Sequence, residues 1–225
     1  MPQDINRIIL PLPLGMGKVN CYLIRTGAGH VLIDTGGSNA RKRLCRELAN
    51  AGCKRGSLKL VILTHGDFDH IGNAAYLRTA FGTRIAMHRD DTEMAERADM
   101  FVNRKRPNLI VAQLIPILSG FGKSERFKPD LLIEDRYDLS QYGLEAEVIC
   151  LPGHSRGSVG ILTARGDLFC GDLFDNTKGP ALNSLMDDPT AARSSVAKLE
   201  GLTIGTVCPG HGQPFAMESL AKGRP

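Results

Sequence analysis

The chain has 225 residues, 42% hydrophobic and 23% charged, a composition typical of a folded protein that can bury a substantial core. Its 28 basic and 24 acidic residues leave a formal net charge of +4, too weak a bias to indicate a nucleic-acid-binding protein. Residues 1–17 lack the apolar run of an export signal, and the most apolar later stretch, 109–118, is too short to span a bilayer. We therefore expect neither nucleic acid nor a membrane as a partner.

Cysteine usage bears on the cellular compartment. The sequence has six cysteines, none in a C-x-x-C pair: Cys21, Cys45, Cys53, Cys150, Cys170 and Cys208. A chain of this size does not need disulfide bonds to hold its core, and several of these residues lie in apolar, strand-like runs. We expect buried free thiols and a cytoplasmic location.

Short β-branched runs alternate with helical patterns along the chain. In the first half we predict strands at 18–25, 30–34, 58–63 and 84–87, and helices from Ser38 or Asn39 to Gly52 and over 71–81. In the second half we predict strands at 146–151, 158–164, 167–170 and 204–208, and a helix that begins at Asp188 and Pro189. This alternation predicts mixed α/β layers.

Residues 89–130 form a helical insertion of different character. An acidic helix start is followed by basic clusters on either side of an apolar run. Within 99–128 only Asp99 and Glu125 oppose six basic residues: Arg104, Lys105, Arg106, Lys123, Arg126 and Lys128. The segment is either a lid over a site or a solvated excursion with a small apolar contact of its own. As a lid, its charge would favour an anionic small-molecule substrate.

Four side chains of metal-ligand type follow the predicted strand 58–63 within six residues: His65, Asp67, Asp69 and His70. In a non-helical backbone, the side chains at 65, 67 and 69 project to one side, while His70 begins to turn the other way. Imidazole and carboxylate together suit zinc, iron, manganese or cobalt. Taken alone, the acidic residues could instead cap a helix N-terminus.

Three more such residues, His154, Asp172 and His211, each follow a glycine in a loop at a predicted strand end. Glycine permits the tight turns and close backbone approach that a crowded metal site requires. Four of the six histidines thereby fall into one pattern, and we interpret His30 and His88 as structural. The joint pattern favours a metal site over helix capping.

At these residues the chain resembles the metallo-β-lactamase-fold superfamily, whose signature is His-x-His-x-Asp-His followed by a separate His, an Asp and a final His. Further matches are Val31-Leu32-Ile33-Asp34-Thr35-Gly36, Leu151-Pro152-Gly153-His154-Ser155, Phe169-Cys170-Gly171-Asp172 and Pro209-Gly210-His211-Gly212. The resemblance covers nearly the whole chain. It implies a single α/β (α+β) domain over 1–225, a four-layer αββα sandwich with the metals at one edge of the two sheets.

The resemblance also implies a ligand set. One divalent metal ion would be held by His65, residue 67 and His154, and a second by Asp69, His70 and His211, with Asp172 bridging the two. Asp34 would orient the site loops without binding metal. Asp69 would also act as the catalytic residue that positions the attacking water.

The chain departs from the family pattern at Asp67, where most relatives carry His. Three carboxylates and four neutral imidazoles carry −3, one unit more negative than the usual set. The lower site charge should acidify a bound water less strongly. Harder oxygen ligation moves the preference from the zinc that the family implies toward iron or manganese. An acidic residue here is also similar to the Glu of di-iron flavodiiron relatives, whose flavin-binding domain has no counterpart in these 225 residues.

We predict a metal-dependent hydrolase that uses two divalent ions and a water on an ester, thioester, lactone or related bond of a small molecule. Two alternatives belong to other classes: a di-iron redox or oxygen-handling protein, and a metal-binding protein without turnover.

Overall fold

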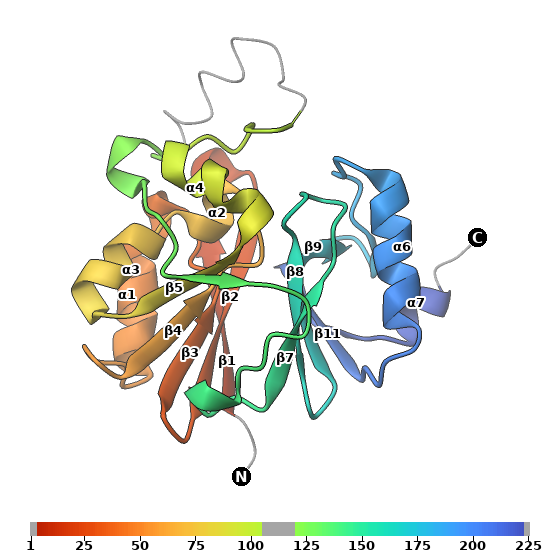
Figure 1. The fold of residues 1–225 in the computed structure, drawn as a ribbon, viewed down its shortest axis with the longest axis horizontal. Helices are drawn as coiled ribbons and strands as arrows, with labels where there is room; N and C mark the ends of the chain where they lie inside the picture. The colour runs from red at the N-terminus through yellow and green to blue at the C-terminus, as the bar shows by residue number, and fades with distance from the viewer. Residues whose placement is uncertain (1–3, 105–119, 223–225) are drawn as a thin grey trace.

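Two sheets pack face to face and carry helices on their outer faces in the computed structural model, which describes residues 4–104 and 120–222 (Figure 1). The first sheet has the order β1-β2-β3-β4-β5-β6, antiparallel from β1 to β3 and parallel from β3 to β6. Its strands are β1 (Asp4–Pro11), β2 (Lys18–Thr26), β3 (Gly29–Ile33), β4 (Leu58–Ile62), β5 (Arg84–His88) and β6 (Leu131–Ile133).

The second sheet has the order β12-β11-β9-β8-β7, and β10 pairs with β9 beside this path. Its strands are β7 (Ala146–Cys150), β8 (Val159–Thr163), β9 (Asp167–Asn176), β10 (Ala181–Leu182), β11 (Thr206–Gly212) and β12 (Phe215–Ala216). The pair β9 and β11 is parallel, and its register shifts twice between Cys208 and His211. These irregularities lie where the sequence turns to Pro209 and Gly210, which cannot continue a regular ladder.

The helices lie outside the sheets, with α1 and α3 beside the first sheet and α6 and α7 beside the second (Figure 1). The described α-helices are α1 (Arg41–Asn50), α2 (Phe68–Ile71), α3 (Ala74–Phe81), α4 (Thr92–Arg97), α6 (Pro189–Leu199) and α7 (Ser219–Lys222). Asp188 caps α6 by accepting from the backbone N–H groups of Thr190 and Ala191, and Pro189 occupies its first turn. None of the described helices is both long and apolar enough to cross a membrane.

The apolar residues divide into three buried layers, which confirm the predicted αββα sandwich. Successive side chains of β2 enter different layers. Cys21 and Leu23 pack toward α1 and α3, while Tyr22 and Ile24 pack between the two sheets. A third cluster joins the second sheet to α6. Because both faces of the central strands are covered, the strands read as nearly continuous apolar runs.

Most predicted elements are present with shifted bounds. The helix predicted over 71–81 is present from Ala74 as α3, and the short helix α2 before it ends at Ile71. The backbone leaves the helical conformation at Asn73 between them. The predicted strands 167–170 and 204–208 continue into β9 and β11. Asp172 and His211 therefore lie within irregular strands and not in loops beyond them. Strands β1, β6, β10 and β12 were not predicted.

The insertion begins with the acidic helix start that the sequence indicates, as the 3-10 turn Arg89–Asp91 followed by α4. Beyond it, Phe121 and Phe127 are buried against the first-sheet core, so this part of the insertion is packed. Lys105, Arg106 and the apolar run lie outside the described residues. The lid therefore stays a prediction.

Candidate metal centre

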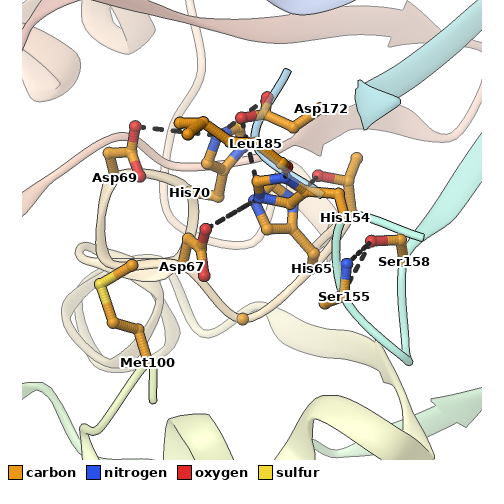
Figure 2. A network of polar contacts seen from close by, with 12 residues as sticks. His65, Asp67, Asp69, His70, Met100, His154, Ser155, Ser158, Asp172 and Leu185 are labelled. Atoms are coloured by element: carbon orange, nitrogen blue, oxygen red, sulfur yellow. Dashed lines mark hydrogen bonds and ion pairs between the residues drawn. The ribbon is translucent and has the colours of Figure 1, made fainter. Parts of the chain in front are cut away.

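The predicted ligand residues lie together at one edge of the sandwich and come from both sheets. Figure 2 labels six of them: His65, Asp67, Asp69, His70, His154 and Asp172. Donor atoms of the ligand residues form two groups in which all atoms lie within 4.8 Å of one another: His65, His154 and Asp172, and Asp69, His70 and His211. Each group takes residues from both sheets, because positions 65 to 70 follow β4 whereas His154, Asp172 and His211 belong to the second half. Asp67 lies beside the first group.

Asp34, at the end of β3, orients the loop that follows β4. It is buried, has a positive φ of 58°, and accepts hydrogen bonds from the backbone N–H and the hydroxyl of Thr64, both at 2.8 Å. Its Oδ2 also lies 2.8 Å from Nδ1 of His70. The Thr64 hydroxyl oxygen lies 3.0 Å from Nδ1 of His65. Asp34 thus fixes both rings without reaching the common centre, as the sequence indicates.

The other two histidines are held in the same way by backbone oxygens. Nδ1 of His154 lies 2.6 Å from the carbonyl oxygen of Leu185, and Nδ1 of His211 lies 2.7 Å from that of Lys18. When Nδ1 donates its proton to such an acceptor, Nε2 carries the free lone pair. All four rings therefore turn Nε2 toward the shared centre, as metal-ligating histidines do.

Asp172 lies between the two groups. One of its oxygens is 3.4 Å from Nε2 of His70, and the other is 3.3 Å from Nε2 of His211 and 3.9 Å from Nε2 of His154. Gly210 makes this position accessible, since a Cβ atom there would lie 2.2 Å from an Asp172 oxygen. The carboxylate is placed to bridge two ions.

Buried polar atoms that lack a hydrogen-bond partner show whether these residues fit metal ions. Among the described residues, only four buried side-chain polar atoms lack a hydrogen-bond partner, and three of them are here: Nε2 of His65, Nε2 of His70 and Oδ1 of Asp172. Buried polar atoms are normally satisfied, so a cluster of unsatisfied lone pairs calls for a cation. The donor set, imidazole with carboxylate, fits two divalent transition-metal ions.

The charge of the metal-free site is dominated by its carboxylates. Although burial lowers them, the pKa values of His154 and His211 are raised to about 9, the first mainly by Asp67 and the second mainly by Asp172. Despite burial, the facing His211 holds the pKa of Asp172 well below its usual range. By contrast, burial lowers the pKa of His65, helped by the neighbouring His70. The carboxylates therefore favour positive charge on these rings, which protons supply when no metal is bound, and a metal ion must displace those protons.

Asp91 was missed by the sequence analysis as a site residue. This buried carboxylate, just before α4, accepts from the backbone N–H of Gly66 at 3.0 Å, the hydroxyl of Ser155 at 2.6 Å and the backbone N–H of Gly157 at 2.8 Å. It thereby ties the loop that carries His65 to the loop that carries His154. In the sequence it reads only as one of several acidic residues at a helix start.

Arg104 was predicted only as part of a basic cluster. Its guanidinium pairs with Asp67 and with Asp187, and donates to the carbonyl oxygens of His154 and Met100. The pairing with Asp67 required the insertion to fold back onto the loop after β4, which no local pattern reveals.

A cavity of 450 Å³ opens onto the ligand groups. Apolar side chains supply part of its wall: Leu12, Met16, Phe68, Met100 and Leu185. Met16 and Leu185 are largely exposed, so the apolar wall reaches the surface. Polar residues from β2, β9 and the loop after β10 line the rest, among them Lys18, Asp175 and Asn183.

Comparisons with known proteins agree with this architecture. The model of the metallo-beta-lactamase superfamily matches residues 14–211. Human metallo-beta-lactamase domain-containing protein 1 is 29% identical over 209 residues, which are 90% of this chain and 65% of that protein. The chain thus spans slightly less than two thirds of this relative's length.

Two further similarities bear on chemistry and metal. The probable metallo-hydrolase YqjP of Bacillus subtilis is 25% identical over 241 residues, covering 95% of this chain and 73% of that protein. The solved structure of TTHA1623 in a di-iron-bound form is 28% identical with a TM-score of 0.69, covering 96% of this chain and 98% of that one.

Proposed function

This chain belongs to the metallo-beta-lactamase superfamily, and on that premise we propose that it is a metal-dependent hydrolase of small molecules with an ester, thioester or lactone bond. The observation that carries the proposal is the pair of facing ligand groups, in which three buried ligand-type atoms have no hydrogen-bond partner. Two divalent ions held there would lower the pKa of a water molecule and polarise the oxygen of the scissile carbonyl group.

Within this site each residue has a proposed task. His65, Asp67 and His154 would hold one ion and Asp69, His70 and His211 the other, and Asp172 would contribute to both positions. Asp69 lines the cavity and its Oδ2 lies 3.4 Å from Nε2 of His211. From there its carboxylate can accept a hydrogen bond from the attacking water and orient it toward the substrate.

The cavity supports a substrate with an apolar group next to the cleaved bond. Met100 and Leu185 supply apolar wall beside His154, whereas the basic residue Lys18, whose carbonyl oxygen contacts His211, lines the other side. Burial of an acyl or alkyl group against such a wall contributes about 25 cal/mol per Å² of apolar surface. An anionic group on the far side of the bond would meet Lys18.

The test begins with the protein freed of metal and reloaded separately with zinc, manganese or ferrous iron. Each form is assayed with acetyl and octanoyl esters and thioesters, a lactone and a phosphodiester. We expect hydrolysis of the carboxylic esters or thioesters, faster for octanoyl than for acetyl. Metal-loaded protein that leaves every one of these bonds intact would contradict the proposal.

A second candidate function is a di-iron redox or oxygen-handling protein. It is favoured by the similarity to TTHA1623, whose structure contains two irons, and by the oxygen ligand Asp67. Anaerobic purification followed by metal analysis and reaction with oxygen tests it. Iron at about two per chain that is oxidised on exposure to air, with no hydrolysis of the ester panel, would favour this candidate.

The six cysteines support the cytoplasm as the proposed location. All are free in the structure, and Cys21, Cys53, Cys170 and Cys208 are buried. Free buried thiols are typical of proteins in a reducing compartment.

A further inference from the structure

Asp67, which occupies the place of the second histidine in the signature that the sequence resembles, forms an ion pair with Arg104. Both side chains are buried, with 9% and 8% of their surface exposed. The Nε atom of Arg104 also lies 2.5 Å from Asp187, whose side chain is 37% exposed. Buried ion pairs are costly to break, because either partner alone is left as an uncompensated charge.

The two oxygens of Asp67 face different partners. Oδ1 pairs with the guanidinium of Arg104, whereas Oδ2 lies 2.9 Å from Nε2 of His154 and 3.6 Å from Nε2 of His65. One oxygen is therefore directed at the first ligand group, and the other is directed away from it. Asp67 can serve the first metal position without releasing Arg104.

The pair changes the charge of the ligand set. Asp67, Asp69 and Asp172 with four neutral imidazoles carry −3, and adding the always-protonated guanidinium gives −2. Asp187, the other carboxylate on Arg104, is not counted because it lies outside the ligand set and its side chain is 37% exposed, so water screens its charge. The resulting charge is the value of a set with neutral histidine in place of Asp67. The lower site charge expected from the sequence is thus offset by a residue from the insertion.

Arg104 is not placed to bind a substrate. Its Nε and both terminal nitrogens already donate to Asp187, Asp67 and the carbonyl oxygens of Met100 and His154. It is also not among the residues that line the cavity, whereas Asp67 is. Its contacts point inward, to the loops that carry ligands.

We propose that Arg104 is a permanent counter-cation for Asp67, so that the two residues act as one neutral unit at the first metal position. This inference rests on the proposed metal centre but not on its hydrolytic activity. Arg104 is a positioning and charge-compensating residue, and it does not touch the metal or the substrate.

The first test measures metal affinity. Arg104→Met removes the charge but keeps a long apolar stem, Arg104→Lys keeps the charge, and Arg89→Met is the matched control because Arg89 pairs with Glu134 at the exposed surface. Competition with a chelating dye and elemental analysis give the affinity and number of zinc and manganese ions. Circular dichroism verifies that each variant is folded.

We expect Arg104→Met to bind the more weakly held divalent metal ion about tenfold or more tightly. The substitution removes a positive charge that repels the ion in a water-poor environment. Arg104→Lys and Arg89→Met should have metal affinities within about twofold of that of the wild type, because both keep the positive charge beside Asp67. Unchanged or weaker binding by Arg104→Met would overturn charge compensation.

The second test uses the metal-free protein and needs no ion at all. In the wild type, Arg104→Met leaves Asp67 without its counter-charge and should lower the melting temperature by about 5 °C or more. In the Asp67→Asn background, the buried charge of Arg104 has lost a partner. Arg104→Met removes this charge and should therefore raise the melting temperature. Effects of equal sign in both backgrounds would show that the two residues do not act as a unit.

The outcomes separate this inference from the proposed function. A protein that hydrolyses none of the esters can still show the reversal of sign and the change in metal affinity. A protein that binds no metal in any form contradicts the proposed function, while the melting temperatures still decide whether Asp67 and Arg104 form a unit.

Discussion

Asp172 is the residue on which both ligand groups converge. Because its two oxygens face His70 on one side and His154 with His211 on the other, its loss should weaken both metal positions together. We expect Asp172→Asn to retain less than about a tenth of each ion after dialysis, a loss within the range for altered metal surroundings. Elemental analysis measures this. Asp175→Asn, on the same strand but outside both groups, is the control. Full metal occupancy in the Asp172→Asn variant would contradict the bridging role.

His154 and His211 give the metal-free protein a defined pH dependence. Although burial opposes it, Asp67 and Asp172 raise their pKa values from 6.5 to about 9. Protonated rings therefore stabilise the fold fully below pH 6.5, and this contribution is lost as the pH rises through 9.

We accordingly expect the melting temperature of chelator-treated protein to fall between pH 6.5 and 9. Thermal denaturation in buffers across this range measures it. His211→Gln should flatten the slope, while His88→Gln, at a histidine outside the ligand groups, should leave it unchanged. A metal-free protein equally stable across the range would contradict the raised pKa values.

At the residue scale, the sequence was sufficient to single out the donor atoms but not what surrounds them. Histidine and aspartate beside glycine at strand ends are visible locally. Six of the seven predicted residues form the two groups, and Asp67 lies beside the first. Arg104 and Asp91 act through partners 37 and 25 residues away, so their roles depend on how the insertion folds back. A contact of that kind has no periodic or local signature.

Among the elements, the loop that carries His65 and the loop that carries His154 are linked by Asp91. Asp91→Ala would leave the backbone N–H groups of Gly66 and Gly157 without acceptors, at a cost of about 2–4 kcal/mol in the free energy of unfolding. Since the loops of His65 and His154 would also lose their link, metal affinity should fall about 10- to 100-fold.

Chemical denaturation and dye competition measure these two effects, and the exposed neighbour Asp90 offers the matched control as Asp90→Ala. If Asp91→Ala lowered stability but left metal affinity at the wild-type value, Asp91 would be a structural residue only.

Element types were easier to predict than element ends. Strands β2, β3, β4, β7 and β8 were predicted within two residues because their apolar runs are bounded by polar or glycine residues. Strands β9 and β11 extend beyond prediction, because parallel pairing between them continues past Gly171 and Pro209 despite shifts in register. Pairing partners supply hydrogen bonds that local propensity does not anticipate.

For the whole molecule, the layer between the sheets supplies stability independently of the site. Phe169 is 1% exposed and its ring centroid lies 5.0 Å from that of Tyr22 on the opposite sheet. We expect Phe169→Ala to cost about 3–5 kcal/mol in the free energy of unfolding, the range for a buried aromatic residue, without lowering the metal content of the folded protein.

Denaturant titration with elemental analysis checks this, and Tyr76→Ala, at a partly exposed aromatic residue, should cost under about 1 kcal/mol. Loss of metal from folded Phe169→Ala protein would show that the inter-sheet core and the site are not separable.

The αββα arrangement was predicted through resemblance, and the alternation of strands and helices alone gave only mixed layers. The physical reason is that both faces of the central strands are buried, so periodicity does not tell which face meets a helix and which meets the other sheet.

Each ligand group draws on both sheets, and this has a consequence for biosynthesis. A nascent chain that has emerged as far as the loop after β4 holds His65, Asp69 and His70, but it completes neither group. The first group is complete only after Asp172 has left the ribosome, and the second only after His211. Metal acquisition is therefore a late event that follows the docking of the two sheets, and premature or truncated chains would be released without the ions.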